Sequence, residues 1–252
     1  MELLENNLYF SRPQYLFLAS EARSGSTYFA NTIEYSLHET MGGHFWDLSK
    51  EKFANSRLAT FNPLETAESI YLNPHGFRCS KLLANEISVL FRHAVKCSAL
   101  SDIMFGSNTY WIIVRRRNRI RQAISQACAI KSGVYHFYDE VENAPDFNME
   151  ISDAEIMESL NMIAFSDIYL ENLPLILNKS VTVFYEDFMQ DKKSCIENVF
   201  IALGLPYGKN LKLTIPPLKR TNSIRKEQAE CSFLKYFLNS YGISEGSPIH
   251  KG

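Results

Sequence analysis

Closely spaced cysteines are missing from this sequence. The five that occur, Cys79, Cys97, Cys128, Cys195 and Cys231, are odd in number, and no pair of them forms a CxxC motif. Zinc sites and disulfide frameworks need closely spaced or evenly paired cysteines. We therefore expect reduced thiols, a cytoplasmic location and no bound metal.

Long hydrophobic runs and an excess of one charge are also missing. No apolar stretch approaches the ~20 residues of a membrane helix. Residues 1–10 carry two glutamates and no basic segment before an apolar core, so we expect no signal peptide. Lysine and arginine total 26 against 28 acidic residues, a net charge of -2. This balance predicts no general attraction to nucleic acid or membranes, so any anion site must come from local clustering of basic residues.

The sequence has instead an alternation of short apolar runs and helical patterns. The runs typical of buried strands are Gln14–Ser20, Gly76–Leu83, Thr109–Val114 and Ser180–Tyr185. The helical patterns lie around Ser26–Leu37, Asn85–Lys96, Asn118–Lys131, Ile156–Leu173 and Lys192–Leu203. This order predicts an α/β fold of three layers, with a central, mostly parallel sheet flanked by helices, in a single domain over residues 1–252.

Two segments fall outside this alternation. Tyr135–Asp153 is acidic and aromatic without a clear period, which is typical of a surface insertion; a lid and a connection without a role both stay open. The segment 216–252 begins with basic residues (PPLKRTNSIRK) and then contains a helical pattern, SFLKYFLNSY. Gly204, after the pattern at Lys192–Leu203, is expected to end that helix.

The stretch RSGST, residues 23–27, follows the first predicted strand and precedes the first predicted helix. Unpaired N–H groups and the helix dipole favour an anion at such a junction. Arg23 supplies charge, Gly25 permits close approach of the backbone, and three side chains supply hydroxyl groups: Ser24, Ser26 and Thr27. An ordinary strand–turn–helix with a serine cap is the alternative.

A second basic stretch, VRRRNRIRQAISQACAIKS, follows the strand predicted at Thr109–Val114. Asn118 can cap the next helix, and Arg121 and Ser125 share one face of it. With Arg116 and Arg117 at the start of this helix, the pattern suits a second phosphate. A solvated basic face and a nucleic-acid patch are the alternatives, and the acidic balance of the chain disfavours the latter.

Taken together, these stretches resemble the PAPS-dependent sulfotransferases, in particular the bacterial trehalose 2-sulfotransferase branch, whose acceptors are sugars and glycolipids. RSGST is similar to the 5′-phosphosulfate loop of that branch, and Arg117 to Ser125 has the spacing of the 3′-phosphate motif. Further resemblances are RNRIRQAISQACAIKSGVYHF, GFRCSKLL, FYEDF, ALGLP and PLKR. The resemblance covers roughly Tyr15 to Phe237.

The resemblance implies a sulfotransferase that moves the sulfuryl group of 3′-phosphoadenosine 5′-phosphosulfate (PAPS) to a carbohydrate or glycolipid hydroxyl. The product of the donor is then PAP, no metal is needed, and a homodimer is possible. Arg23 would contact the leaving phosphate within a loop that also includes Ser24, Gly25, Ser26 and Thr27. Arg117, or Arg116 in another register, would hold the 3′-phosphate with Ser125. Lys219 and Arg220 would close over the nucleotide, unless they are ordinary surface charges.

Two other functions stay open. One is a P-loop nucleotide kinase or phosphotransferase, and the other is a non-catalytic nucleotide-binding protein of the same fold. The kinase pattern GxxxxGK[ST] is missing, as is an aspartate after a strand that would hold Mg²⁺. These absences favour the sulfotransferase.

The catalytic base is the point at which the sequence departs from that family. The turn after the first helix contains His44 where the family has a glutamate. An imidazole with a pKa near 6.5 suits the removal of a hydroxyl proton, although a turn histidine without a role is the alternative. Glu39 is the next candidate and Glu34 a weaker one. For the acceptor, the candidates are Trp46, Tyr135, His136 and Tyr138.

We expect His44→Ala to lower turnover by about 10²–10⁴-fold, the range typical of removing a general base. Affinity for PAP should be unchanged, because His44 is assigned no contact with the nucleotide. Sulfuryl transfer and PAP binding measured on His44→Ala and Glu39→Ala check this. An inactive Glu39→Ala beside an active His44→Ala would assign the base to Glu39.

Overall fold

The structure is a computed structural model that describes residues 14–41, 71–72, 77–133, 150–205, 212–215 and 223–240. These parts of the chain belong to two compact units. Residues 1–117 and 166–216 form the first unit, and residues 118–165 and 217–252 form the second. The single domain over residues 1–252 stays a prediction, because a compact unit is not by itself an independently folding domain.

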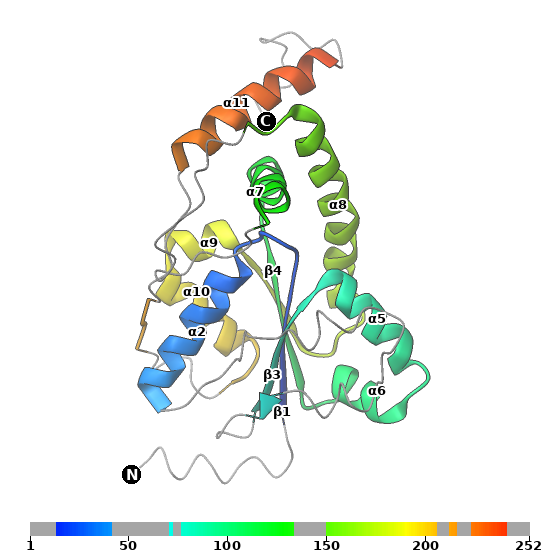
Figure 1. Ribbon diagram of the computed structural model, residues 1–252. Coiled ribbons are helices and arrows are strands. Elements are labelled where there is room, and N and C mark those ends of the chain that lie inside the picture. Colours follow the sequence, from blue (N-terminus) through cyan, green and yellow to red (C-terminus); the bar gives the residue numbers. More distant parts are fainter. Residues whose placement is uncertain are drawn as a thin grey trace. The chain divides into compact units, whose positions relative to one another are not determined.

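The first unit is built on a five-stranded sheet with the order β2-β3-β1-β4-β5. The strands are β1 (Gln14–Ser20), β2 (Tyr71–Leu72), β3 (Phe77–Leu83), β4 (Thr109–Arg115) and β5 (Ser180–Phe184). β1 pairs in parallel with β3 and β4, β4 pairs in parallel with β5, and β2 alone is antiparallel. The predicted α/β fold with a mostly parallel central sheet is therefore confirmed (Figure 1).

Helices cover both faces of this sheet. They are α2 (Ser26–Met41), α5 (Ala84–Ala94), α6 (Ser98–Phe105), α9 (Tyr185–Gln190), α10 (Lys192–Ala202) and the C-terminal part of α8 (Asp153–Asn172), which continues into η2 (Leu173–Leu175). Side chains alternate along a strand, so Leu16 and Leu18 of β1 enter one core while Phe17 and Ala19 enter the other. The first core is completed by α2, α9 and α10, and the second by α5, α6 and the end of α8.

The predicted strands all occur, and their ends move by no more than one residue. The strand predicted at Ser180–Tyr185 is one residue too long, because Tyr185 begins α9. Gly204 ends α10 as expected: it has φ +67°, and the Leu205 N–H donates to the Phe200 carbonyl at 2.8 Å. Among the described elements, the sequence did not predict β2, α6, α9 and η2. They are short, so periodicity gives little signal for them.

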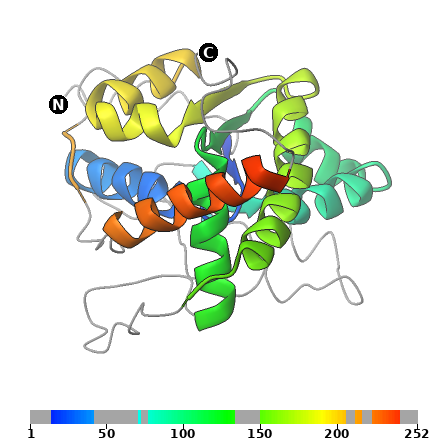
Figure 2. The same ribbon diagram turned by 90° about the horizontal axis from the view of Figure 1, so that it is seen from above.

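The second unit consists of α7 (Arg119–Ser132), the N-terminal part of α8 and α11 (Ser223–Ser240). Figure 2 shows α11 crossing α7, and the two helices share a small core with α8 that contains Ile124, Ile163 and Phe233. Asn118 caps α7 as predicted, since its side chain accepts from the Arg121 N–H at 2.8 Å. The Arg121 side chain in turn pairs with Glu230 of α11.

The structure describes part of each of the two segments outside the alternation, Tyr135–Asp153 and 216–252. α8 begins at Asp153, the last residue of the predicted insertion, and Ser152 caps it with a hydrogen bond from its N–H to Glu155 at 2.7 Å. The helix near the C-terminus begins at Ser223, earlier than the pattern SFLKYFLNSY predicts. Residues 134–149 and 216–222 lie outside the described parts of the chain.

All five cysteines are free thiols. In the part of the chain that the structure describes, no helix combines the length and the apolar character needed to cross a bilayer. Within the same ranges, histidine, cysteine, aspartate and glutamate side chains form no cluster of three or more that could hold a metal ion.

Candidate anion-binding site

Three strand exits meet at one edge of the first unit. In the parallel register, Ser20 at the end of β1 lies between Leu83 of β3 and Val114 of β4. The residues that follow these strands are therefore neighbours at the carboxyl edge of the sheet. Ligands of open α/β sheets bind at this edge.

The loop between β1 and α2 contains two residues in the left-handed region. Arg23 has φ +59°, the one positive value among the non-glycine residues that the structure describes, and Gly25 has φ +87°. Left-handed residues alternating with right-handed ones turn successive N–H groups into one concave nest, which attracts anions. Helical hydrogen bonding in α2 starts with the Phe29 N–H, which donates to the Gly25 carbonyl at 3.1 Å. The Ser24 N–H donates to the Glu21 carbonyl at 3.4 Å, and the first N–H groups of α2, at Ser26 and Thr27, come before this ladder begins, at the end of a helix that favours anions.

Gly25 is required by packing as well as by its backbone conformation. A Cβ atom at this position would lie 2.1 Å from Cδ2 of the Tyr185 ring, far inside van der Waals contact. The ring of Tyr185, at the start of α9, thus packs directly on the loop backbone. A protein neighbour, the Tyr185 ring, therefore leaves no room for a side chain at Gly25, and the approach of a ligand to its backbone stays a prediction.

The hydroxyl groups of the loop differ in their surroundings. Ser24 is fully buried, and its Oγ has no hydrogen-bond partner within the described ranges. Ser26 is buried as well, at the first position of α2. Thr27 is half-buried, and its Oγ1 accepts a hydrogen bond of 2.7 Å from Nζ of Lys81.

Lys81 is the site residue that sequence reasoning missed. It lies in β3, opposite Leu18 of β1, within the stretch GFRCSKLL. Burial lowers the pKa of Lys81 from 10.5 to about 8; nearby Glu86 opposes the shift and nearby Arg23 adds to it. A lysine in an otherwise apolar strand end was the available signal, because a buried ammonium group needs a partner.

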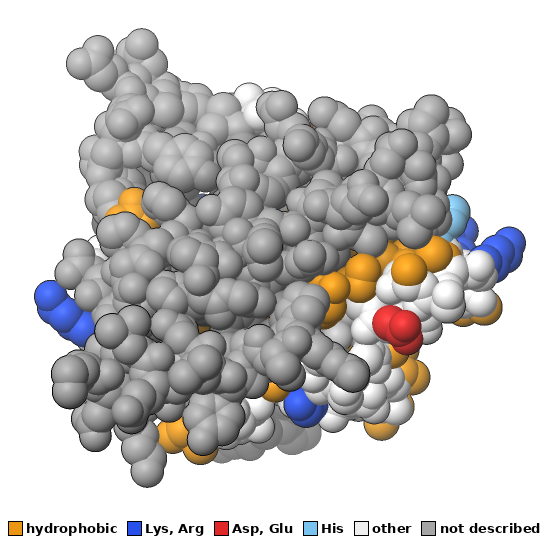
Figure 3. Space-filling view, turned by 90° about the horizontal axis from the view of Figure 1, so that it is seen from below, with side chains coloured by type: hydrophobic (Ala, Val, Ile, Leu, Met, Phe, Trp, Pro, Cys, Tyr) orange, Lys and Arg blue, Asp and Glu red, His pale blue; other side chains and the backbone are white. Residues whose placement is uncertain are grey.

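Arg116 connects the loop to α9. Its Nη1 donates to the Arg23 carbonyl at 3.2 Å, and its guanidinium lies 5.2 Å from the centre of the Tyr185 ring. Its Nε lies 3.9 Å from a Glu186 carboxylate oxygen. Arg23, Lys81 and Arg116 thus gather around one loop. In Figure 3, which shows the molecule from below, the visible side chains of described residues include hydrophobic, acidic and basic groups, with a histidine next to basic side chains on the right.

Arg117 faces a different environment from Arg116. Its guanidinium pairs with Asp187 through two hydrogen bonds, one of them 2.7 Å long, and lies 4.2 Å from the centre of the Phe184 ring. The hydrogen bond to Asp187 raises the pKa of Arg117, and the same contact lowers the pKa of Asp187. Ser125, its predicted partner, is buried on α7 in the second unit. The joint role of Arg117 and Ser125 stays a prediction, as does the register between Arg116 and Arg117.

The remaining candidates are placed only in part. Glu39 and Glu34 both lie in α2, and Glu34 is half-buried. The candidates outside the described residues are His44, Trp46, Tyr135, His136, Tyr138, Lys219 and Arg220. The structure therefore brings the cations Arg23, Lys81 and Arg116 together, and it leaves the base and the acceptor residues as predictions.

No family model matches this chain, and a search of curated proteins finds no match either.

Replacement of Gly25 should show how tightly the loop is packed. Gly25→Ala places a methyl group in a left-handed conformation and drives it into Tyr185, which together should cost about 2–5 kcal/mol of folding stability. Gly204→Ala is the matched control, because Gly204 has φ +67° and a methyl group there would meet no atom of the described residues within 4 Å. It should cost only about 1–2 kcal/mol. Urea unfolding of both variants measures the difference, and equal losses would contradict the packing argument.

Proposed function

We propose that this protein is a PAPS-dependent sulfotransferase acting on a hydroxyl of a carbohydrate or glycolipid. The observation that carries the proposal is the hydrogen bond from Lys81 to Thr27 at 2.7 Å. In a P-loop nucleotide triphosphatase, the hydroxyl at the corresponding point of the loop binds Mg²⁺. Here an ammonium group holds that hydroxyl, and a cation next to it disfavours a second cation. The loop therefore suits a phosphate bound by fixed protein charges.

Sulfuryl transfer needs such charges at the leaving group. The acceptor oxygen attacks sulfur in line, the bond from sulfur to the 5′-phosphate oxygen breaks, and negative charge grows on that oxygen. In this proposal, Arg23, Lys81 and the N–H groups at the start of α2 would stabilise the charge on this oxygen. Preorganised donors of this kind stabilise developing charge without reorganising during the reaction.

The other roles in the proposal follow the resemblance. Arg117 or Arg116, with Ser125, would bind the 3′-phosphate, and Lys219 with Arg220 would cover the nucleotide. His44, or Glu39 in its place, would accept the proton of the attacking hydroxyl. A cytoplasmic location agrees with five free thiols. The homodimer rests on the resemblance alone.

Thermal-shift titration tests this function directly. PAP should stabilise the protein without any metal, by about 2.7 kcal/mol when its concentration is a hundred times its dissociation constant. AMP should stabilise it less, because AMP lacks the 3′-phosphate. ATP with Mg²⁺ is the comparison for the kinase. A larger shift with ATP and Mg²⁺ than with PAP would overturn the proposal, and PAP binding without turnover on any hydroxyl would favour the non-catalytic protein.

Affinity for PAP should also depend on the charge of Lys81. The ammonium form attracts the 5′-phosphate, and since burial holds the pKa of Lys81 at about 8, that form is lost as the pH rises through this value. Between pH 7 and pH 9 the affinity should fall by up to about tenfold, the change in the protonated fraction. Lys81→Met should bind PAP more weakly at pH 7 and lose this dependence. Lys81→Arg, charged throughout, should lose the dependence too. If PAP affinity depends on pH in the same way in wild type and Lys81→Met, Lys81 does not contribute to PAP binding.

A further inference from the structure

The carboxylate of Asp187 is bound to the two terminal nitrogens of the Arg117 guanidinium, the atoms with which arginine binds a phosphate. Both terminal nitrogens of the guanidinium donate to the two Asp187 oxygens, and the Nη2–Oδ2 distance is 2.7 Å. The same two nitrogens form the fork with which arginine binds carboxylate or phosphate. The two side chains are 51% and 52% exposed, so the pair is open to solvent and to a competing anion.

Arg117 also has contacts that do not involve Asp187. The Phe184 ring lies under one face of the guanidinium, 4.2 Å from centre to Cζ, and this contact orients the plane. The Arg117 backbone N–H donates to Oε2 of Glu186 at 2.9 Å, which fixes the chain where it leaves β4. The ring and Glu186 therefore contact Arg117 independently of Asp187.

We infer that Asp187 is an internal competitor, which holds the Arg117 fork in the free protein and is displaced when a phosphate binds there. The inference rests on the proposed function for the identity of that phosphate, the 3′-phosphate of PAP. When the phosphate binds, it replaces the Asp187 carboxylate at Arg117, so the guanidinium is paired with an anion both before and after binding. The exchange weakens nucleotide binding and favours release of the product.

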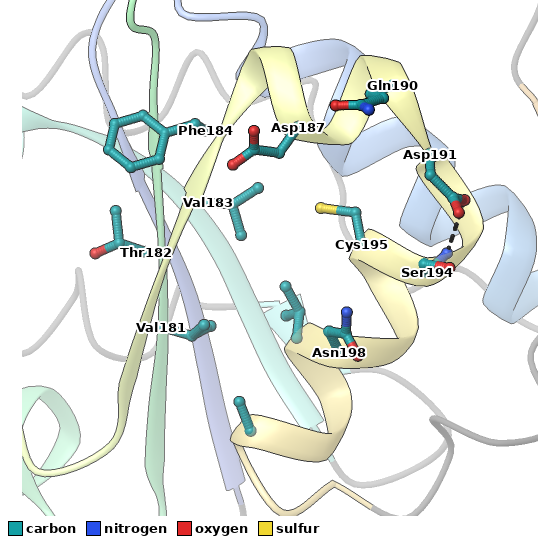
Figure 4. Close-up of a pocket in the computed structure, with 12 residues that line it drawn as sticks. Val181, Thr182, Val183, Phe184, Asp187, Gln190, Asp191, Ser194, Cys195 and Asn198 are labelled. Carbon is teal, nitrogen blue, oxygen red and sulfur yellow. Dashed lines mark hydrogen bonds between the residues drawn. The ribbon is translucent and has the colours of Figure 1, made fainter.

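The structure provides room for the displaced carboxylate. Asp187 lines a cavity of about 450 Å³ between β5 and α10, whose wall includes Thr182, Cys195 and Asn198 (Figure 4). The Asp187 carboxylate lies on the Phe184 side of this cavity. A change of side-chain rotamer would turn it toward space that is partly polar, so displacement need not strain α9.

Two adjacent acids therefore have opposite effects on one arginine. Glu186 holds the backbone of Arg117 and lies 3.9 Å from Nε of Arg116, so it positions both cations. Asp187 occupies the fork of Arg117. Replacing either acid by its amide changes the net charge by the same amount, which makes Glu186→Gln a matched control for Asp187→Asn.

The experiment is a titration of both variants with PAP and with AMP. Asp187→Asn should bind PAP about two- to fivefold more tightly than wild type, a modest gain because exposed ion pairs are weak. Its affinity for AMP, which lacks the 3′-phosphate, should be unchanged. Glu186→Gln should bind PAP more weakly. In Arg117→Ala/Asp187→Asn, PAP affinity should equal that of Arg117→Ala. Asp187→Ser, which shortens the side chain, should repeat the gain if the amide variant folds poorly.

Each other outcome overturns the inference in a distinct way. Weaker PAP binding by Asp187→Asn would make Asp187 a positioning residue like Glu186. If Asp187→Asn and Glu186→Gln bind PAP more tightly by the same factor, the gain comes from the change in net charge and not from the release of Arg117. If wild type does not prefer PAP to AMP, the proposed function fails, and inorganic pyrophosphate then serves as the probe. Asp187→Asn should still bind pyrophosphate more tightly than wild type, and only when Arg117 is present. If this gain is not observed, the inferred competition between Asp187 and a bound anion is wrong.

Discussion

Parallel pairing of β1 with both β3 and β4 is the constraint on which the candidate site depends. Since all three strands run the same way in aligned register, Ser20, Leu83 and Val114 come to one edge of the sheet. The loop after β1, the end of β3 and the arginines after β4 become neighbours although they lie far apart in the chain. An antiparallel neighbour in place of β3 or β4 would send one of these groups to the opposite edge.

Cations gathered in this way repel one another, and the surrounding residues offset that repulsion. Glu86 lies near Lys81, Glu186 near Arg116, and Asp187 on Arg117. Burial still lowers the pKa of Lys81, which means that the charged form of Lys81 is less stable here than in water. A bound phosphate, as proposed, would supply further negative charge and would stabilise the ammonium form of Lys81.

Tyr185 joins the two halves of this arrangement. Its ring packs on the backbone of Gly25 and lies beside the guanidinium of Arg116. The glycine in RSGST and the tyrosine in FYEDF are thus two sides of one contact. Tyr185 makes this contact as the first residue of α9, directly after β5.

The sequence by itself determined the four parallel strands, most helices and the loop that could hold an anion. Period-two and helical patterns report burial along one segment, and the order of the segments specified a parallel sheet. Only the tertiary structure decided which charges meet. Lys81 reaches Thr27, Arg116 reaches the Arg23 carbonyl and Asp187 takes the fork of Arg117, all across long separations in the chain. Such contacts depend on strand register and on the short helix α9, and neither leaves a periodic signal in the sequence.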